Sequence, residues 1–366
     1  MDFSRCPLVQ YDDMPQKELS EMASLNGMSI LVTGGAGFIG SHLVDRLVDE
    51  KPERLVVVDN FYFGKDKIRN LSSANTVFPS LKIYDQDATK MRPMKQILRN
   101  ENIDVVFNLA VIALPVSLAK PKWTYDTNSA ISSTLCELLR KDCFKTLVHF
   151  SSSEAYGDAE QIPMGEDHSL KPSTPYGASK IASDHLVLSY IRTFGVDASI
   201  IRPFNTYGPR QHEGTYAGVI PVTIRRILNG ESPVIDGDGL QTRDYTYVTD
   251  TADAAVKTCQ AKSTRGKVLN IASGEEMSIK NLITKIAKIM NCKKPIVFDK
   301  PRPGDVRRFI GNNSLARKLV HYEPKIGFDE GLEYTIDWYR ELYATQDKTK
   351  SSLQGKPHKS VQRLQK

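Results

Sequence analysis

Short apolar runs alternate with longer stretches of helical periodicity through the first two hundred residues. Six runs predict strands: Ser29–Thr33, Arg54–Asp59, Lys82–Asp85, Val105–Leu109, Thr146–Ser151 and Ala198–Arg202. Between them, amphipathic patterns predict helices at Ser41–Glu50, Met94–Asn100, Trp123–Lys141 and Ser179–Phe194. Fully apolar strands that alternate with helices are typical of a parallel sheet covered on both faces. We therefore predict an α/β fold with a doubly wound parallel sheet.

The pattern changes after about residue 203. Short segments rich in Pro, Gly and Tyr, such as Arg202–Arg210 and Asp236–Val248, indicate loops and short strands, and a helix at Ser278–Met290 and a strand at Lys294–Phe298 follow. We expect a smaller C-terminal lobe that binds substrate. The predicted organisation is an N-terminal extension (1–27), a nucleotide-binding domain (28–203, with later segments returning to it), the substrate lobe (204–345) and a disordered basic tail (346–366).

A glycine-rich turn joins the first strand to the first helix. The segment Met28-Ser-Ile-Leu-Val-Thr-Gly-Gly-Ala-Gly-Phe-Ile-Gly40 places Gly34, Gly37 and Gly40 at three-residue intervals. Such a turn brings backbone N–H groups and a helix N-terminus up to a pyrophosphate, and side chains there would block the approach. The turn predicts a dinucleotide-binding, Rossmann-type sheet.

An acidic residue ends the second strand. Asp59 lies nineteen residues after Gly40. A carboxylate there accepts hydrogen bonds from a ribose 2′-hydroxyl and repels a 2′-phosphate. We therefore predict NAD rather than NADP.

Composition narrows the function classes. The 366 residues are 40% hydrophobic and carry a net charge of +6, of which +5 lies in the tail from Gln346, while residues 1–27 carry −3. The remaining charge of +4 is spread over residues 28–345 and is not concentrated into a basic face that would bind nucleic acid. No run approaches the roughly 20 apolar residues of a membrane span. Five scattered cysteines and no signal peptide predict reduced thiols in a cytoplasmic protein, with neither nucleic acid nor membrane as partner.

A tyrosine and a lysine are spaced to share one helix face. In Tyr176-Gly-Ala-Ser-Lys180 the two side chains are one turn apart. A lysine at this position can lower the pKa of the phenol and make it a proton acceptor near neutral pH. The pair follows a strand that ends in a serine cluster, which suggests a catalytic site there.

These motifs, taken in order, resemble the extended short-chain dehydrogenase/reductase family, in the branch that acts on nucleotide-diphosphate sugars. The resemblance spans roughly residues 28 to 340. It is carried by the glycine turn, Asp59, Asn108-Leu-Ala110, Asn128, Ser151-Ser-Ser-Glu-Ala-Tyr-Gly157, Tyr176-x-x-x-Lys180, Arg202-Pro-Phe-Asn-Thr-Tyr-Gly-Pro-Arg210 and Gln241-Thr-Arg-Asp-Tyr245.

The resemblance implies a role for each matching residue. Tyr176 takes the proton of the sugar C4 hydroxyl while NAD accepts the C4 hydride, Lys180 holds the nicotinamide ribose, and Ser152 hydrogen-bonds the C4 oxygen. Asp87 contacts the adenine. The cofactor-binding set implied by the family is Gly34, Gly37, Phe38, Ile39, Gly40, Asp59, Asn60, Asp87, Ala110, Asn128, Tyr176 and Lys180.

The reaction that follows C4 oxidation depends on Glu154. A 4,6-dehydratase needs a base for the C5 proton, and Ser152-Ser153-Glu154 resembles the catalytic triplet of such enzymes, although the deoxythymidine-diphosphate-glucose enzymes carry aspartate at Ser153. A 4-epimerase needs no such carboxylate. The Ser-Glu pair also resembles UDP-glucuronate decarboxylases. We favour the dehydratase over the epimerase and the decarboxylase, and over a non-catalytic NAD-binding regulator on the same fold.

The resemblance also implies how substrate is held. Asn205, Arg243 and Arg308 are placed like residues that bind the diphosphate-sugar, with Arg307 as a competitor for Arg308, and with Gln241, Asp244 and Asp305 as residues that orient the arginines. UDP-sugars are favoured over GDP-sugars. A homodimer built on Trp123–Lys141 and Ser179–Phe194 is expected.

His42 and His149 are expected to be structural, His212 is a weaker candidate for the cleft, and no metal site is expected.

Overall fold

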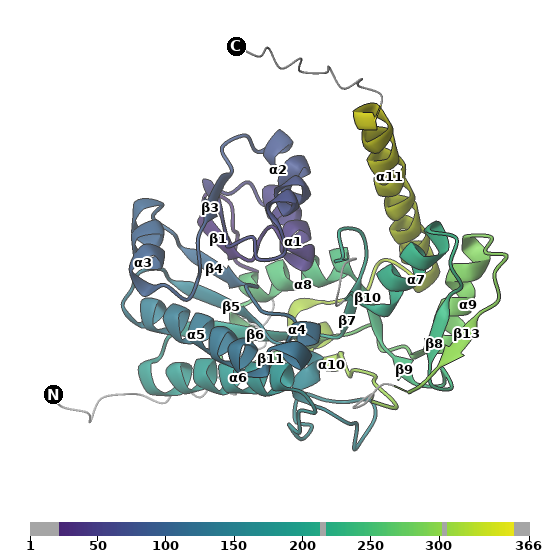
Figure 1. Ribbon diagram of the computed structural model, residues 1–366. Coiled ribbons are helices and arrows are strands. Elements are labelled where there is room, and N and C mark those ends of the chain that lie inside the picture. Colours follow the sequence, from purple (N-terminus) through teal and green to yellow (C-terminus); the bar gives the residue numbers. More distant parts are fainter. Residues whose placement is uncertain (1–21, 213–216, 302–305, 355–366) are drawn as a thin grey trace, which may run out of the picture.

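A seven-stranded parallel sheet forms the centre of the computed structural model, which describes residues 22–212, 217–301 and 306–354 (Figure 1). The strand order is β11-β6-β5-β4-β1-β2-β3. The strands are β1 (Ser29–Thr33), β2 (Arg54–Asp59), β3 (Lys82–Asp85), β4 (Val105–Asn108), β5 (Thr146–Phe150), β6 (Asp197–Pro203) and β11 (Val268–Ile271). The order reverses between β1 and β4, which places a crevice at the carboxyl ends of these strands.

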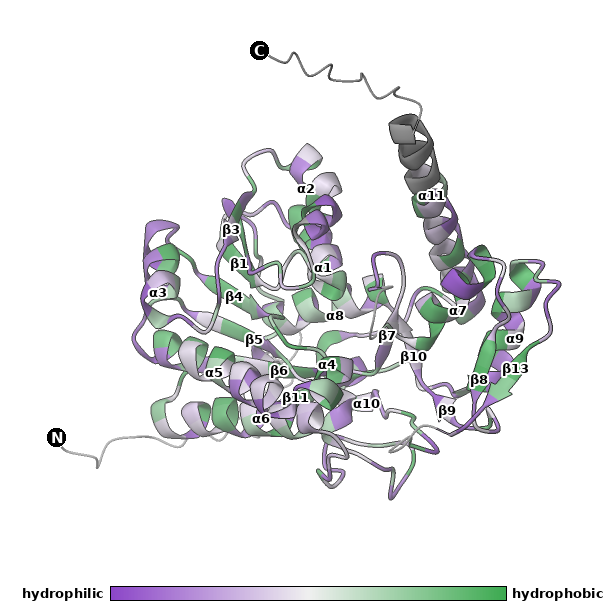
Figure 2. Cartoon of the chain, in the orientation of Figure 1, coloured by the Kyte–Doolittle hydropathy of each residue, from purple (hydrophilic) through white to green (hydrophobic). Residues whose placement is uncertain are grey.

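Helices cover both faces of this sheet because its strands are apolar on both sides. Ile30 and Val32 of β1 pack on one face, and Leu31 between them packs on the other. One face is covered by α1 (Phe38–Val48), α8 (Val248–Gln260) and α10 (Ser314–Val320), and the other by α3 (Met91–Asn100), α5 (Pro121–Arg140) and α6 (Pro175–Phe194). Figure 2 shows the apolar strands between the two helical layers. The predicted α/β fold class is confirmed.

A second lobe lies beside the carboxyl ends of the strands (Figure 1). Its core is formed by the apolar faces of three helices, with Ile224, Ile283 and Ile336 fully buried. The helices are α7 (Val219–Leu228), α9 (Ile279–Ile289) and α11 (Phe328–Gln354). Short strands pair as β7 (Asn205–Tyr207) with β10 (Tyr245–Tyr247), β8 (Val234–Asp236) with β13 (Val297–Asp299), and β9 (Thr242–Arg243) with β12 (Met277–Ser278).

Shorter helices complete the described chain. They are η3 (Lys65–Leu71), α2 (Ser72–Val77), α4 (Leu114–Ala119), η4 (Ser153–Ala155) and η5 (Lys262–Thr264). None of the described helices is both long enough and apolar enough to cross a bilayer.

Several elements have other bounds than the sequence predicted. Helix α6 begins at Pro175 rather than Ser179, and the strand predicted at Lys294–Phe298 is β13, Val297–Asp299. Helix α1 begins at Phe38 rather than Ser41, and its N-cap is Gly37 of the glycine turn. Helix α11 continues to Gln354, past the predicted start of the basic tail at Gln346; residues 355–366 lie outside the described range. Of the N-terminal extension, the part from residue 22 is described. Leu25 is buried in the core, and Ala23 N–H donates to the carbonyl of Gln260 at 2.8 Å.

Candidate active site

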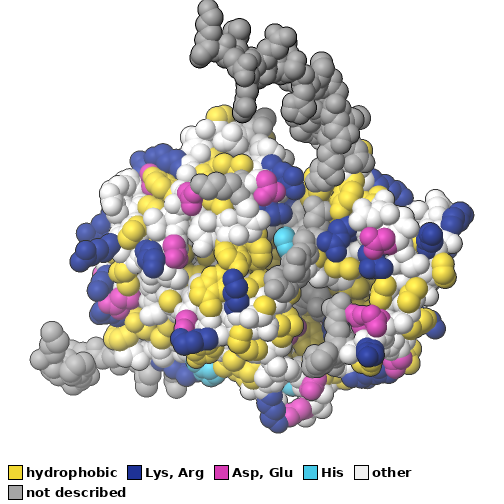
Figure 3. Space-filling model, viewed as in Figure 1, with side chains coloured by type: hydrophobic (Ala, Val, Ile, Leu, Met, Phe, Trp, Pro, Cys, Tyr) yellow, Lys and Arg dark blue, Asp and Glu magenta, His cyan; other side chains and the backbone are white. Residues whose placement is uncertain are grey.

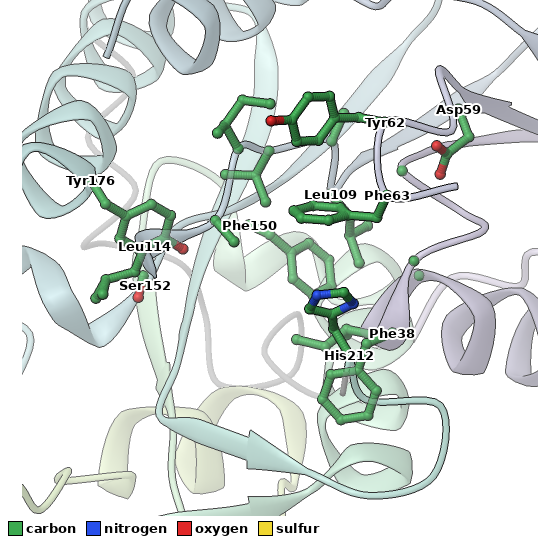
Figure 4. Close-up of a pocket in the computed structure, with 18 of the residues that line it drawn as sticks. Phe38, Asp59, Tyr62, Phe63, Leu109, Leu114, Phe150, Ser152, Tyr176 and His212 are labelled. Carbon is green, nitrogen blue, oxygen red and sulfur yellow. The ribbon is translucent and has the colours of Figure 1, made fainter. Parts of the chain in front are cut away.

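A cavity of about 490 Å³ lies between the carboxyl edge of the sheet and the second lobe. Figure 3 shows hydrophobic side chains gathered at the centre of this side of the molecule. The close-up in Figure 4 places Asp59 at one end of the cavity and Tyr176 with Ser152 at the other. Residues from the ends of β1, β2, β4 and β5 line it, together with the first turns of α1 and α6.

The glycine turn is shaped to admit a pyrophosphate. Gly34 has φ +68°, and a Cβ there would lie 2.8 Å from the Ala110 nitrogen. A Cβ on Gly40 would lie only 2.2 Å from the Gly34 carbonyl oxygen. Glycine is therefore required for the strand, the turn and α1 to approach one another. Phe38 and Ile39, at the N-terminus of α1, line the cavity, where the positive end of the helix dipole favours an anion.

Asp59 and its neighbours form the far end of the cavity. The Asp59 carboxylate accepts hydrogen bonds from the backbone N–H of Ala36 at 3.1 Å and of Phe61 at 2.8 Å. Burial raises its pKa, and these two hydrogen bonds oppose the shift. Asn60 and Asp87 also line this end. The carboxylate fixed at the end of β2 and the open glycine turn fit the ribose and the pyrophosphate of NAD.

Ala110 and Asn128 have different positions. Ala110 lines the cavity, and its N–H donates to the Thr33 hydroxyl at 3.2 Å. Asn128 is not among the lining residues. Its amide oxygen accepts from the N–H of Ile112 at 2.8 Å, and its Nδ2 donates to Ser179 Oγ at 3.0 Å. Because these bonds connect the loop after β4 to α6, Asn128 holds the cavity wall in place.

The serine cluster after β5 lies directly beside α6. Ser152, Ser153 and Glu154 all line the cavity. Ser152 Oγ accepts from the N–H of Glu154 at 3.2 Å and so begins the turn η4. Burial raises the pKa of Tyr176, and the neighbouring Ser152 hydroxyl opposes this rise. The three residues and Tyr176 are thus brought together, as the sequence predicted.

Helix α6 positions Tyr176 in its first turn, after the N-cap Thr174. Burial raises the pKa of the Tyr176 phenol above its usual value, and the Glu154 carboxylate adds to the rise. Lys180 Nζ donates to the Phe150 carbonyl at 2.8 Å and lies 5.8 Å from the centre of the Tyr176 ring. Burial lowers the pKa of Lys180 to about 8. The expected lowering of the Tyr176 pKa by Lys180 is not seen in this structure, where burial raises the pKa of Tyr176.

The proposed substrate-binding residues are only partly brought to the cavity. Asn205 lines it, and its Nδ2 donates to the Asp244 carbonyl at 3.1 Å. Arg243 is not among the lining residues, and its Nη1 donates to the carbonyls of Thr242 and Val306 at 2.8 and 2.7 Å.

The two other arginines form ion pairs near the surface of the second lobe. Arg308 pairs with Glu276 at 2.8 Å, and Arg307 pairs with Asp238 at 2.9 Å. More than half of each arginine side chain is exposed, and neither lines the cavity. Each arginine is held by a carboxylate of its own lobe instead of lining the cavity. The spacing of residues in the sequence could not reveal these ion pairs.

The residues expected to orient these arginines make other contacts. Gln241 Nε2 donates to the Asp236 carbonyl at 2.9 Å. The buried Asp244 carboxylate accepts from the backbone N–H groups of Ser273, Gly274 and Gly311, at 2.8, 3.0 and 3.2 Å. Asp244 thus holds backbone segments together. Asp305 lies outside the described residues.

Two aromatic residues that line the cavity, Tyr62 and Phe63, were not predicted from the sequence, and His212 was predicted only as a weak candidate. Tyr62 and Phe63 line the cavity after β2, and the Phe63 ring packs against His212 at 5.1 Å between ring centres (Figure 4). The aromatic run that follows Asp59 was the available signal. His42 is structural, as expected: its Nε2 lies 3.0 Å from the Pro209 carbonyl oxygen, outside the cavity. Over the described chain, no group of three His, Cys, Asp or Glu residues could hold a metal.

The fold and this site define a class of dinucleotide-dependent enzymes with a Ser-Tyr-Lys centre. Comparison with known proteins identifies the family. A family model described as GDP-mannose 4,6 dehydratase matches residues 31–335. The chain belongs to the extended short-chain dehydrogenase/reductase family of NAD-dependent nucleotide-sugar epimerases and dehydratases.

Relatives at similar sequence identity are named for different reactions. A putative UDP-glucose 4-epimerase from Methanocaldococcus jannaschii is 33% identical over 85% of this chain and 98% of its own. A UDP-N-acetyl-alpha-D-glucosaminuronate decarboxylase from Bacillus cytotoxicus is 32% identical over 85% and 98%. A dTDP-glucose 4,6-dehydratase from Mycobacterium tuberculosis is 32% identical over 86% and 94%. Identity alone does not separate these reactions.

Solved structures agree on the fold. UDP-glucose 4-epimerase from Thermotoga maritima, with UDP-glucose, has a TM-score of 0.81 at 33% identity and covers 86% of this chain and 100% of its own. A dTDP-glucose 4,6-dehydratase from Streptomyces venezuelae with NAD bound has a TM-score of 0.81 at 27% identity, covering 87% and 98%. The family, the fold and NAD as cofactor are thereby confirmed.

Proposed function

We propose that the protein is an NAD-dependent nucleotide-diphosphate-sugar 4,6-dehydratase. The observation that carries this proposal is the position of Glu154, which lines the same cavity as Tyr176 and Ser152. A 4-epimerase has no step that needs this carboxylate. A dehydratase needs a base beside the sugar, and Glu154 is a carboxylate at the nicotinamide-ribose end of the cavity.

Each residue then has a task. NAD, when bound, supplies the hydride acceptor for C4 and the hydride donor for C6. Tyr176 accepts the proton of the C4 hydroxyl, and Ser152 hydrogen-bonds the same oxygen. Glu154 removes the C5 proton, which the C4 ketone acidifies, and water is lost from C5 and C6. Addition of the hydride at C6 and a proton at C5 balances the sequence and yields a 4-keto-6-deoxy sugar.

The experiment is incubation with UDP-glucose, UDP-N-acetylglucosamine, dTDP-glucose and GDP-mannose in D2O, without added NAD. A dehydratase gives a product lighter by one water that carries deuterium at C5. The variant Glu154→Gln is expected to oxidise C4, with absorbance of reduced nicotinamide, but not to eliminate water. Full elimination by this variant would refute the role of Glu154.

A 4-epimerase is the second candidate, because relatives named as epimerases are 33 and 34% identical to this chain and Ser153 replaces the aspartate found in some dehydratases. In the same assay an epimerase gives a C4 epimer of unchanged composition with no deuterium at C5. Release of CO2 from a UDP-uronate indicates a decarboxylase. Saturable NAD binding without turnover of any sugar indicates a regulator.

We also propose UDP-sugars as the preferred substrates and a homodimer as the assembly. Helices α5 and α6 lie side by side on the outer face of the sheet (Figure 1). Trp123 and Phe194, on these helices, are 38 and 50% exposed. Exposed aromatic rings of this size are suited to a helical interface. Light scattering on the purified protein tests the assembly, and a monomer at micromolar concentration contradicts it.

A further inference from the structure

Polar groups at the end of β5 contact the buried face of the catalytic helix α6. Tyr176, Lys180 and Asp184 are spaced four residues apart, so they share one face of α6. Consecutive residues of β5 and the following turn meet this face. The contacts are His149 with Asp184, the Phe150 carbonyl with Lys180, Ser151 with Asp184, and Ser152 with Tyr176.

Asp184 is a buried carboxylate in which one oxygen accepts hydrogen bonds and the other does not. Its Oδ2 accepts from Ser151 Oγ at 2.7 Å and from Arg202 Nε and Nη2 at 3.0 and 2.8 Å. Its Oδ1 has no hydrogen-bond partner within the described chain, and neither has His149 Nε2. These two atoms lie 3.8 Å apart, and both side chains are at most 2% exposed. They are therefore each other's available partner in a region closed to water.

The hydrogen-bond network assigns the tautomer of His149. The Thr33 hydroxyl accepts from the N–H of Ala110 at 3.2 Å, so its own proton goes to Asn108 Oδ1 at 2.8 Å. The Asn108 amide nitrogen is then the donor to His149 Nδ1 at 3.0 Å. A neutral ring that accepts at Nδ1 carries its proton on Nε2, which faces Asp184. The ring is neutral because burial and the nearby Lys180 ammonium lower its pKa.

The charges around Lys180 show what this network does. Burial favours the neutral amine of Lys180, and the Asp184 carboxylate opposes this effect. The Arg202 guanidinium of β6 forms an ion pair with Asp184. If Asp184 lost its negative charge, the cations of Arg202 and Lys180 would face each other in the core. Tyr176 and Glu154 also lie at this end of the cavity, and Arg202 interacts with Tyr156 and Glu166 as well as with Asp184. The charge of Lys180 therefore depends on Asp184 remaining ionised.

We propose that Asp184 and His149 are positioning residues that keep the Lys180 ammonium charged and fixed against the carbonyl of Phe150. His149 contributes as a neutral Nε2–H donor directed at Asp184 Oδ1. The proposal deepens the proposed function, since it concerns the lysine of the same site. Because C4 oxidation precedes dehydration, epimerisation and decarboxylation alike, it can be tested with whichever reaction the protein carries out.

The first test needs no turnover. In full-length protein labelled with 15N-histidine, the resonances of His149 are assigned by their loss in His149→Gln. The expected result is a neutral ring with its proton on Nε2 from about pH 5.5 to 8.5. An Nδ1–H tautomer, or titration of His149 within this range, would overturn the proposal whatever the reaction is.

The second test uses the pH dependence of the first chemical step. Asp184→Asn removes the opposite charge and leaves Arg202 facing Lys180, so the alkaline limb of kcat is expected to move down by about one pH unit. The rate then falls roughly fivefold at pH 8 and changes little at pH 6.5, with KM within about threefold. Asp197→Asn, which breaks the ion pair of β6 with Arg265, is the matched control with an unchanged profile. An unshifted profile in Asp184→Asn overturns the proposal.

A pair of histidine variants keeps the question decidable if Asp184→Asn does not fold. His149→Leu leaves the Asn108 amide nitrogen without its acceptor and removes the Nε2–H that is directed at Asp184 Oδ1. We expect kcat to fall about tenfold, the factor of one lost buried hydrogen bond. His149→Gln can present an N–H to Asp184 and is expected to recover most of this loss. Equal kcat values for the two variants, at equal melting temperature, would contradict a positioning role for His149.

Discussion

Replacing Gly40 by alanine tests whether the glycine turn is required by close packing. Gly40 lies in the first turn of α1, where alanine ordinarily stabilises a helix by about 1 kcal/mol relative to glycine. The structure reverses this expectation. An added Cβ would lie 2.2 Å from the Gly34 carbonyl oxygen and 2.9 Å from Gly35 Cα, and both are backbone atoms that cannot rotate away.

The size of the effect follows from this distance. Ordinary van der Waals contact begins at 3.4 Å, so α1 must move by about 1 Å relative to the turn. Overpacking of this kind costs about 1–3 kcal/mol, which exceeds the helical gain. The movement also displaces the N-terminus of α1 from the pyrophosphate position, and loss of one charge-assisted hydrogen bond there lowers affinity for NAD by about tenfold or more.

The assay combines the NAD content of the purified protein with thermal unfolding. Gly40→Ala is expected to retain little NAD and to melt a few degrees lower, roughly 2–5 °C. Gly327→Ala is the matched control, because no heavy atom lies within 4 Å of its added Cβ and its φ is ordinary. If Gly40→Ala keeps the NAD content and melting temperature of this control, the close-packing argument for the turn is refuted.

Three further substitutions test other parts of the site. Thr174→Ala removes the N-cap bond to the Gly177 N–H and should cost about 1 kcal/mol and lower kcat, whereas Ser278→Ala, which uncaps α9, should cost as much without affecting kcat. Burial lowers the pKa of His42 to about 4, below its unfolded value near 6.5, so stability present above pH 6.5 is lost as the pH falls. Wild type should lose roughly 2 kcal/mol more than His42→Gln between pH 7 and 5 in urea unfolding, and equal losses would contradict this. Asn205→Ala should raise KM about tenfold with NAD content unchanged, since its side chain lines the cavity; an unchanged KM removes it from the site.

Much of the nucleotide-binding half could be predicted because its signals are local. The apolar runs that became β1, β2 and β3 have the predicted limits, and β4, β5 and β6 end or begin within one or two residues of theirs. Strands of this kind are buried on both faces, which leaves little freedom in composition. The second lobe was predicted less completely. Its two- and three-residue strands pair across long sequence separations and carry no periodic signal.

The candidate site shows the same division. Tyr176 and Lys180 could be paired from sequence because four residues make one helical turn. The contacts of Arg308 and Arg307 could not, because each arginine has its carboxylate partner 32 or 69 residues away. Asn128 was likewise assigned to the cofactor, although its hydrogen bonds go to Ile112 and Ser179.

The sequence by itself determined the parallel sheet, the glycine turn, the acid that follows β2 and the Tyr-Lys pair, because each depends on neighbours within one turn or one strand. Only the tertiary structure decided which charges are buried together. His149 and Asp184 are 35 positions apart and carry no recognisable motif, and they face each other because β5 and α6 pack with their polar groups in register. Burial then sets the protonation of Tyr176, Lys180 and His149, since desolvation depends on the whole surrounding fold.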